Sequence, residues 1–350
     1  MDVQRKLRPR AKRVGAYLAI VVFLTMFIPT PYTIQAPGPT FDTLEQVEAE
    51  GTTHDMVEID GAETYPTKGR LDLTTISVSG PPTSSSLVLE VLFHALQPYP
   101  AITPAELLYP PETTGDEVRN QNAEAMVDSQ SWAVAAALEH LDKDYMQRLF
   151  ALDFTEQSPA RGILEPNDEI VSVNGTEITG HGQLVNTIQD AQGEPVEMTI
   201  RRNGAEQTHT IPVAQGEDGT YQVGVFLDSE FEFPIDVDIF LEDVGGPSAG
   251  LMFTLALIDR MTEESVADGR HIAGTGTIDP DGTVGPIGGI QQKVTAAASE
   301  GASIFLAPEL NCEEITHVPD GMTVYSVDTL DTAIEILDAP EGEMNYPTCS

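Results

Sequence analysis

The pattern of hydrophobic and polar residues divides this 350-residue chain into segments with different expected structures. Residues 14–28 are uncharged and apolar, whereas residues 33–80 contain short apolar runs that are broken by turns and are typical of β-strands. Residues 116–141 are predicted to form one long helix, because four residues recur on one helical face: Met126, Gln130, Ala133 and Ala137. The chain is therefore predicted to be an α+β protein with several domains.

The N-terminal 32 residues have the composition of a membrane anchor. Residues 1–13 contain six basic residues, and the apolar run of residues 14–28 follows them. This run is shorter than the roughly 20 residues that usually cross a bilayer, so a cleaved signal peptide is the alternative. Because prolines crowd the junction where a cleavage site would lie, we expect an uncleaved, single-pass transmembrane helix over residues 14–32. The preceding basic residues predict a cytoplasmic tail, residues 1–13, and a body outside the cytoplasm at the cell membrane.

The charge balance and the missing motifs argue against a nucleic-acid-binding protein, a metalloprotein and an ATPase. The chain has 56 acidic and 17 basic residues and a formal net charge of −39, so we expect no nucleic-acid partner. Its acidic residues do not follow the spacing of a calcium-binding loop, and its histidines form no zinc-binding motif. The sequence contains no P-loop. We therefore predict no cofactor, neither a metal nor an ATP site in this chain, and we interpret the acidic residues as a solvated surface.

One stretch, residues 245–298, contains residue types that nucleophilic catalysis needs. It opens with Gly-Gly-Pro-Ser-Ala-Gly and continues as an apolar run. Since proline suits the first position of a helix, Ser248 is predicted to lie in the first helical turn, where free N–H groups favour negative charge. The turn around Gly246, Pro247 and Ala249 would then stabilise an oxyanion beside the serine. The alternative is that Ser248 only caps a buried helix.

The same stretch closes with a helix that carries a lysine on its apolar side. Ile290, Val294 and Ala297 recur at helical spacing, and Lys293 follows Ile290 by three residues. A lysine on an apolar stripe is partly desolvated, which lowers its pKa and lets it accept the proton of a serine hydroxyl. Two alternatives remain, a lysine whose ammonium group reaches water and a histidine from a distant part of the chain as the base.

These motifs resemble the proteolytic domain of Lon-type proteases, whose serine lies in a G-P-S-A-G turn and whose lysine follows P-I-G-G. Both motifs stand here in order, and Thr275 matches a threonine that supports the dyad in that family. The resemblance implies a Lon-type α/β proteolytic domain over residues 225–340 with a catalytic Ser248–Lys293 dyad. It also implies a homo-oligomeric ring and makes the strand Ile235–Phe240, ahead of the serine, a candidate substrate-binding segment.

Two substitutions place the chain nearer one branch of that family. Gly245 and Thr277 stand where the ATP-dependent members carry an aspartate and a glutamate. In both respects the sequence looks like the membrane-anchored PDZ–Lon proteases of bacteria.

Residues 146–216 resemble a bacterial PDZ domain. Residues 158–175 contain its S-P-A, D-x-I and N-G elements, and a helix is predicted over residues 182–191. PDZ domains bind an extended peptide along a sheet edge, and we expect the loop that holds the peptide carboxylate near Leu149–Asp153. The alternative is a spacer that gates or positions the protease. Residues 33–145 are predicted to be a separate, mixed α/β membrane-proximal region.

Cys312 and Cys349 are the only cysteines, and the second lies in the predicted C-terminal tail, residues 341–350. In an exported protein they are expected to form one disulfide that holds the tail. The alternative is two free thiols.

The sequence as a whole predicts an ATP-independent serine endopeptidase that is tethered to a membrane. Ser248 would be the nucleophile, Lys293 the base and Thr275 a supporting residue, and the substrates would be extended or unfolded segments of exported or membrane proteins. The PDZ domain would recruit substrates or gate the protease. Two alternatives are a membrane adaptor whose Lon-like domain is inactive and a protein that processes only its own chain.

Overall fold

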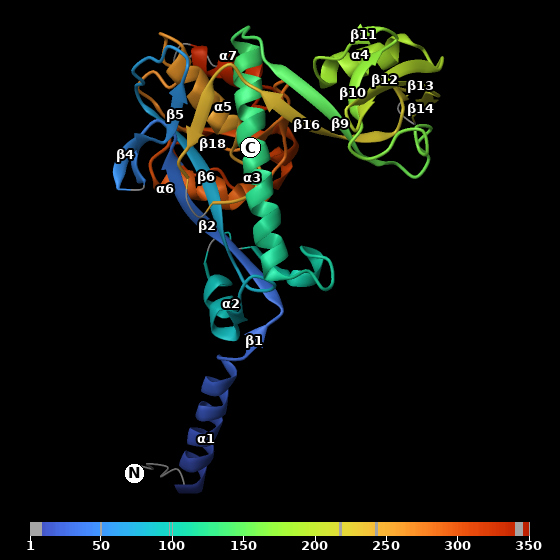
Figure 1. The fold of residues 1–350 in the computed structure, drawn as a ribbon. Helices are drawn as coiled ribbons and strands as arrows, with labels where there is room; N and C mark the ends of the chain where they lie inside the picture. The colour runs from blue at the N-terminus through green and yellow to red at the C-terminus, as the bar shows by residue number, and fades with distance from the viewer. Residues whose placement is uncertain are drawn as a thin grey trace. The chain divides into compact units, whose positions relative to one another are not determined.

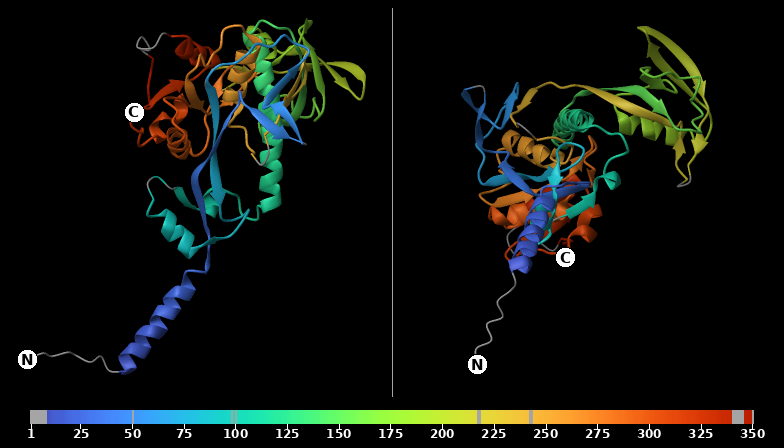
Figure 2. Two further views of the ribbon diagram at one scale, coloured as in Figure 1. Left: turned by 90° about the vertical axis from the view of Figure 1, so that its left-hand side faces the viewer. Right: turned by 90° about the horizontal axis from the view of Figure 1, so that it is seen from below.

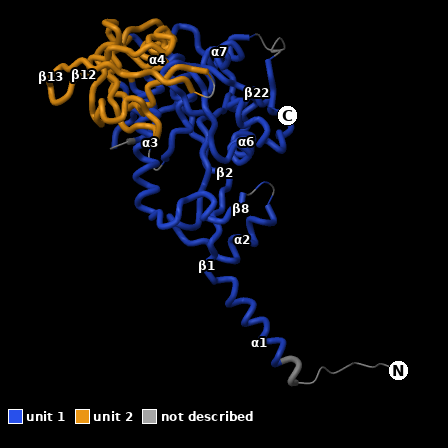
Figure 3. Tube along the Cα trace, turned by 90° about the vertical axis from the view of Figure 1, so that its right-hand side faces the viewer, with its two compact units in different colours: residues 1–58, 63–134, 237–350 blue, residues 59–62, 135–236 orange. Residues whose placement is uncertain are grey.

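The computed structural model divides the chain into two compact units, which are coloured separately in Figure 3. Unit 1 combines residues 1–58, 63–134 and 237–350, and unit 2 combines residues 59–62 and 135–236. The structure describes residues 9–49, 51–97, 99, 101–216, 219–241, 244–339 and 346–349.

The core of unit 1 is a six-stranded mixed sheet with the order β22-β21-β18-β6-β2-β8 (Figure 1). The strands from β22 to β6 run parallel to one another, and β2 and β8 continue the sheet in antiparallel pairings. The strands are β2 Tyr32–Asp42, β6 Arg70–Ser79, β8 Ala101–Pro104, β18 His271–Gly274, β21 Ile304–Pro308 and β22 Thr323–Val327.

This sheet changes the expected domain boundaries. The sequence predicts residues 33–145 as a separate region, but β2, β6 and β8 belong to the same sheet as the strands of the C-terminal third. Leu71 and Leu73 of β6 are fully buried in it. Apolar alternation can identify such a strand, whereas its neighbour in the sheet, β18, lies about 200 residues further along the chain.

Helices α5 and α6 both pack against β6. Ile290, Val294 and Ala297 of α6 lie in one buried cluster with Phe305 of β21, so the apolar stripe predicted from the sequence is the buried side of this helix. The helices of unit 1 are α1 Pro9–Thr25, α2 Val88–His94, α3 Gly115–His140, which continues into unit 2, α5 Gly250–Met261, α6 Ile290–Ser299 and α7 Leu330–Asp338, with 3-10 helices η1 Ala105–Leu107 and η2 Glu309–Glu314.

Unit 1 also contains short strands, some of which extend into residues of unit 2. These strands pair with one another in two-stranded sheets. These strands are β1 Pro29–Thr30, β3 Gln46–Ala49, β4 Thr52–Asp55, β5 Val57–Asp60, β7 Ser86–Leu87, β17 Asp236–Ile239, β19 Thr277–Ile278 and β20 Val284–Gly285.

The N-terminal segment differs from the predicted transmembrane helix over residues 14–32. The helix α1 has 17 residues and ends at Thr25, and β1 follows from Pro29. Within the described residues, no helix has the length and apolar character needed to cross a membrane. The prolines at 29 and 31 cannot donate a backbone hydrogen bond, which explains why the chain leaves the helical conformation here. Residues 1–8 of the predicted basic tail lie outside the described residues.

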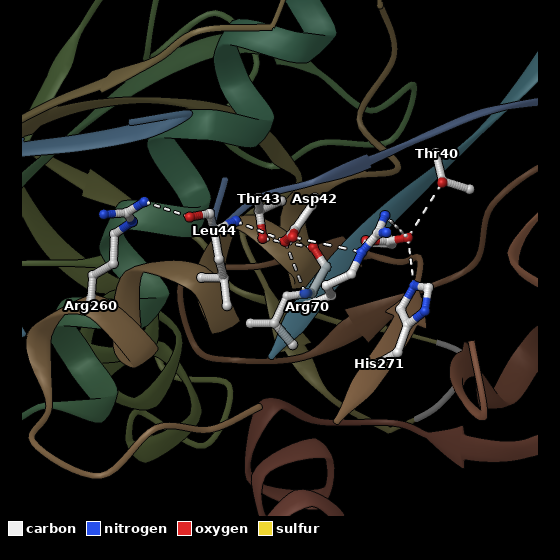
Figure 4. Close-up of polar contacts among 9 residues, drawn as sticks. Thr40, Asp42, Thr43, Leu44, Arg70, Arg260 and His271 are labelled. Atoms are coloured by element: carbon white, nitrogen blue, oxygen red, sulfur yellow. Dashed lines mark hydrogen bonds and ion pairs between the residues drawn. The ribbon is translucent and has the colours of Figure 1, made fainter. Parts of the chain in front are cut away.

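A buried polar cluster connects β2, β6 and β18 (Figure 4). Asp72 is fully buried, and its carboxylate lies 3.0 Å from Arg70 Nη2 and 2.8 Å from His271 Nε2. Asp42 accepts the N–H groups of Leu44 and Leu71, and burial raises the pKa of this carboxyl. Because buried carboxyl groups are costly without partners, these contacts stabilise this arrangement of the three strands.

Unit 2 contains a second six-stranded sheet, with the order β13-β12-β10-β9-β16 and β11 paired to β10. Leu184 and Ile188 of α4 pack into its core, where the sequence predicts a helix. The elements are β9 Met146–Phe154, β10 Glu169–Val173, β11 Thr176–Glu177, α4 His181–Asp190, β12 Val196–Arg202, β13 Ala205–Ile211, β14 Ala214–Gln215, β15 Tyr221–Gln222 and β16 Val225–Glu232.

The end of the chain lies against unit 1, as the two further views in Figure 2 show. Cys312 and Cys349 form a disulfide, which is the predicted pairing. Thr348 forms an antiparallel bridge with Tyr325 of β22, so the tail covers the edge of the sheet. Residues 341–345 and 350 of the predicted tail are outside the described residues.

Candidate active site

Ser248 lies in the turn that leads into α5. The helix begins at Gly250 with Ala249 as its N-cap, so the serine precedes the helix instead of lying in its first turn as predicted. The reason is that the carbonyl oxygen of Ser248 accepts hydrogen bonds from Gly276 N–H at 3.0 Å and Thr275 Oγ1 at 2.9 Å. These contacts come from the segment that follows β18.

The turn limits which groups can stabilise an oxyanion. Pro247 has no N–H, and the N–H of Gly246 donates to the carbonyl of Asn122 at 2.8 Å. Of the three residues predicted for the oxyanion turn, Ala249 therefore remains as a donor, together with the N–H of Ser248 itself. Both groups lie at the N-terminal end of α5, where the helix dipole favours negative charge.

Lys293 reaches Ser248 from α6. Its side chain is 2% exposed, and Nζ lies 2.7 Å from Ser248 Oγ and 2.8 Å from Thr275 Oγ1. Thr275 is fully buried and follows β18 directly. Three residues that the sequence analysis selected from two motifs and the segment between them are thus in contact. Burial lowers the pKa of Lys293 to about 7.

The directions of these hydrogen bonds orient the lysine. Thr275 donates its hydroxyl proton to the carbonyl of Ser248, so its oxygen is free to accept an N–H from Lys293. A neutral lysine held in this way has a lone pair for the hydroxyl of Ser248, which lies at hydrogen-bond distance. The site can therefore remove the serine proton.

Comparison with known families agrees with this geometry. Residues 241–338 match the Lon protease (S16) C-terminal proteolytic domain, and residues 117–213 match the PDZ domain. The chain contains a Lon-type proteolytic domain. A domain of this family is characteristic of a serine endopeptidase.

The relatives of the Lon-type domain are Lon proteases of much greater length. Those of Phenylobacterium zucineum and Desulfatibacillum aliphaticivorans are 29% identical over 181 residues and 31% identical over 151 residues. The matches cover 50% and 43% of this chain, and 22% and 17% of those proteins. Lon protease 2 of Thermus thermophilus is 38% identical over 96 residues, which are 26% of this chain and 12% of that protein. The chain thus spans about a fifth or less of these relatives.

Solved structures of PDZ domains match about a quarter of this chain. One is the PDZ domain of the SdrC-like protein from Listeria innocua, which is 21% identical with a TM-score of 0.22. The match covers 23% of this chain and 92% of that chain. A second PDZ domain, from the SdrC-like protein of Listeria monocytogenes, is 18% identical with a TM-score of 0.21, and the match covers 23% of this chain and 85% of that chain.

The serine turn of the Lon-type domain is held by α3, a helix that lies outside residues 241–338. Ser129 of α3 is buried and donates from Oγ to the carbonyl of Pro247 at 3.0 Å. Asn122, two turns earlier, accepts the N–H of Gly246. A Cβ on Gly245 would lie 2.9 Å from Asn122 Cβ, so glycine permits this close approach.

Ser129 is not identified by the sequence motifs, although its position in the chain carries a signal. The residue follows Met126 by three positions and precedes Ala133 by four, so it lies on the buried stripe of the predicted helix. A hydroxyl on such a stripe needs a hydrogen-bond partner inside the protein.

Two amide side chains hold the helix of the lysine. Asn311 accepts the N–H of Ile287 at 2.8 Å and donates to its carbonyl at 2.9 Å, just before α6. Within α6, Gln291 Oε1 accepts the N–H groups of Thr316 and His317. Asn311 is 1% exposed. Loss of either amide would leave the backbone groups that it pairs with in the loops next to α6 without these partners.

The side chain that contacts the hydroxyl of Ser248 is a lysine and not a histidine. Within the described residues, Lys293 is the hydrogen-bond partner of Ser248 Oγ, and His271 pairs with Asp72 instead. Groups of three or more His, Cys, Asp or Glu residues that could hold a metal ion do not occur in the described part of the chain.

Of the two segments predicted to bind substrate, one is not the loop that was expected, and the other is a strand paired with β5. Leu149–Asp153 is not a loop: it lies within β9, which pairs with β10 on one side and β16 on the other. A peptide cannot add to a strand whose two edges are both paired. The strand predicted at Ile235–Phe240 is β17, which pairs with β5.

Proposed function

We propose that this protein is an endopeptidase that hydrolyses peptide bonds without ATP, with Ser248 as nucleophile and Lys293 as general base. The observation that carries the proposal is the 2.7 Å distance between Lys293 Nζ, which is buried, and Ser248 Oγ. The lowered pKa of Lys293, about 7, supports it because a substantial part of the lysine is then neutral at physiological pH.

The reaction follows from this geometry in two steps. Ser248 Oγ attacks the peptide carbonyl carbon while its proton passes to Lys293, and the N–H groups of Ser248 and Ala249 stabilise the oxyanion. When the C–N bond breaks, the lysine returns the proton to the leaving amine. A water molecule then attacks the acyl-enzyme, Lys293 accepts its proton, and the proton returns to Ser248 as the acid product leaves.

The proposed substrates are extended or unfolded segments of exported or membrane proteins, whose cleavage serves protein catabolism. The sequence contains no P-loop that could power unfolding, so a folded substrate would have to open by itself. Assembly of the Lon-type domain into a homo-oligomeric ring is part of the proposal, and light scattering of the purified protein measures it.

We propose further that unit 2, which contains most of the PDZ-like residues, recruits peptide segments at the free edge of β16. This strand pairs with β9 on one side and ends the sheet on the other. Val225 and Leu227 of β16 pack on the same core as Leu184 and Ile188 of α4. The second edge of β16 offers the backbone groups that β-strand addition uses.

Membrane attachment through α1 is the remaining part of the proposal. Large apolar side chains of this helix are more than half exposed, namely Val14, Tyr17, Leu18, Ile20, Val21, Val22, Phe23 and Leu24. A lipid phase is the environment that accepts such a helix, which can lie in the membrane interface without crossing it. Flotation of the full chain with phosphatidylcholine vesicles tests it, and recovery of the protein only at the bottom of the gradient contradicts it.

The central experiment measures cleavage of an unfolded reporter protein without nucleotide. Wild type should cut the reporter, whereas Ser248→Ala and Lys293→Ala should not. Intact-mass analysis of the protease in the same reactions distinguishes self-processing, which would shorten wild type alone. A wild-type protein that binds the reporter and leaves it uncut would instead be an inactive adaptor.

A further inference from the structure

We propose that α2 is a second membrane-contacting element, with an apolar helical face that lies in the interface of a lipid bilayer beside α1. The inference rests on the proposed membrane attachment through α1 and goes beyond it, because it adds a second helix that contacts the bilayer.

The apolar face of α2 is regular and uncovered. Leu89, Leu92, Phe93 and Leu96 are spaced at i, i+3, i+4 and i+7, which places them on one side of the helix and its C-terminal extension. Their exposed fractions are 43%, 49%, 59% and 88%, and no residue of α2 is buried. Four large apolar side chains on one exposed face indicate a contact surface.

Hydrogen bonds fix this face next to the end of α1. Val88 N–H donates to the carbonyl of Ile28 at 3.1 Å, and Leu89 N–H donates to that of Met26 at 3.0 Å. The strands β1 and β7, which follow α1 and precede α2 respectively, pair with each other (Figure 1). Phe27 and Ile28 are themselves about half exposed, so the apolar surface continues from α2 towards α1.

The distribution of charge favours lipid as the occupant. Residues 14–41 contain no charged side chain, and Glu90 is the only one in residues 73–105 of a chain that has 56 acidic residues. Glu90 accepts the N–H of Leu87 at the start of α2, a capping role. Because charged groups are costly to bring into a bilayer interface, an uncharged end on a strongly acidic protein fits a lipid surface.

A second copy of the chain is the competing occupant. A second copy would need a surface whose shape is complementary to both the face of α2 and the exposed residues of α1. A bilayer can cover both without any complementary shape. The test below separates the two.

Site-specific fluorescence on the full chain tests the proposal. Because both native cysteines are joined in a disulfide, a single new cysteine can be labelled with the environment-sensitive dye nitrobenzoxadiazole. The reporter variants are Phe93→Cys and Leu96→Cys, the second at a position so exposed that folding should not depend on it. Val127→Cys on α3, 61% exposed, is the matched control.

The labelled proteins are mixed with phosphatidylcholine vesicles with and without lipids that carry a nitroxide quencher on the acyl chain. We expect emission from both α2 reporters to rise severalfold on vesicle addition and to fall with the quencher, while the control stays unchanged. If the protein floats with the vesicles but the α2 reporters are not quenched, the α2 proposal is wrong and attachment through α1 stands. Emission that rises with protein concentration in the absence of lipid would assign the face to a second copy and overturn the proposal. If the protein does not float with the vesicles, both the attachment through α1 and the lipid contact of α2 are wrong. That result would not affect the proposed peptidase activity, which is tested by cleavage of an unfolded protein.

Discussion

The hydroxyl of Thr275 donates to the carbonyl oxygen of Ser248 at 2.9 Å. This bond connects the nucleophile turn to the segment after β18, and it also fixes which way the hydroxyl points. The oxygen of Thr275 can therefore accept only from its other neighbour, Lys293 at 2.8 Å. One buried hydroxyl thus positions both the base and the turn that carries the nucleophile.

Thr275→Val removes both hydrogen bonds and should lower kcat by about 10- to 100-fold, because a buried group left unpaired costs roughly 1–3 kcal/mol. KM should change little, since Thr275 is fully buried and does not reach a bound substrate. Thr275→Ser keeps the hydroxyl and should restore most of the rate. Steady-state kinetics on a peptide substrate measure all three proteins, and a Thr275→Ser variant as slow as Thr275→Val would show that the hydroxyl is not what supports the rate.

Replacement of Lys293 should change the dependence of stability on pH. The pKa of this lysine is about 7 in the folded protein, whereas 10.5 is the ordinary value that it takes in the unfolded chain, so between these values the unfolded chain binds more protons. The free energy of unfolding of wild type therefore rises with pH across this window, and below pH 7 the buried ammonium destabilises the fold in full. Lys293→Met should be more stable than wild type at pH 7 by roughly 2–4 kcal/mol.

The advantage of Lys293→Met should shrink as the pH approaches 10. Urea unfolding at pH 7 and pH 9.5 measures it, with Lys143→Met at an exposed lysine as the control that should leave stability nearly unchanged. A constant difference at both pH values would mean that the pKa of Lys293 is not lowered by burial.

The local parts of the site follow from sequence, whereas its long-range supports do not. A stripe of Ile290, Val294 and Ala297 predicts the buried side of α6, because helical spacing is a local property, but it leaves open whether the ammonium group of Lys293 reaches water. The start of α5 is not local. Gly250 begins that helix because the carbonyl of Ser248 accepts hydrogen bonds from Thr275, 27 residues after it, and from the adjacent Gly276.

Sheet neighbours are the main source of the remaining differences. Leu149–Asp153 resembles a loop position in the PDZ pattern, but it is covered on its second edge by β16, which lies about 70 residues further on. The strand β6 likewise joins β18 across about 200 residues. Alternating apolar residues specify a strand and its buried face, and they do not specify which distant strand lies beside it.

The contact between α3 and the serine turn should matter for catalysis. Ser129→Ala leaves the carbonyl of Pro247 without its donor and should lower kcat by up to about tenfold, the rate equivalent of a net hydrogen bond of roughly 1 kcal/mol. Ser131→Ala, on the same helix two residues later, is the matched control and should retain wild-type kcat. Equal activity of the two variants would show that the turn does not depend on Ser129.

Asn311 should act on Lys293 through the loop before α6. Asn311→Ala leaves the N–H and carbonyl of Ile287 unpaired and should reduce both kcat and the free energy of unfolding, the latter by about 1–3 kcal/mol. Leu310→Ala, at the exposed neighbouring position, should change neither. Denaturant unfolding and peptide cleavage are measured on the same samples. Full activity in Asn311→Ala would show that the loop holds its geometry without the amide.

The most direct test of the account is the rate at which a fluorophosphonate labels Ser248 as a function of pH. If Lys293 is the base with a pKa of about 7, the rate should rise about tenfold per pH unit below pH 7, level off above it, and follow a single proton. Lys293→Met should be labelled far more slowly at every pH. A wild-type rate that does not depend on pH between 5 and 9, or a Lys293→Met variant labelled as fast as wild type, would contradict the assignment of Lys293 as the base that activates Ser248.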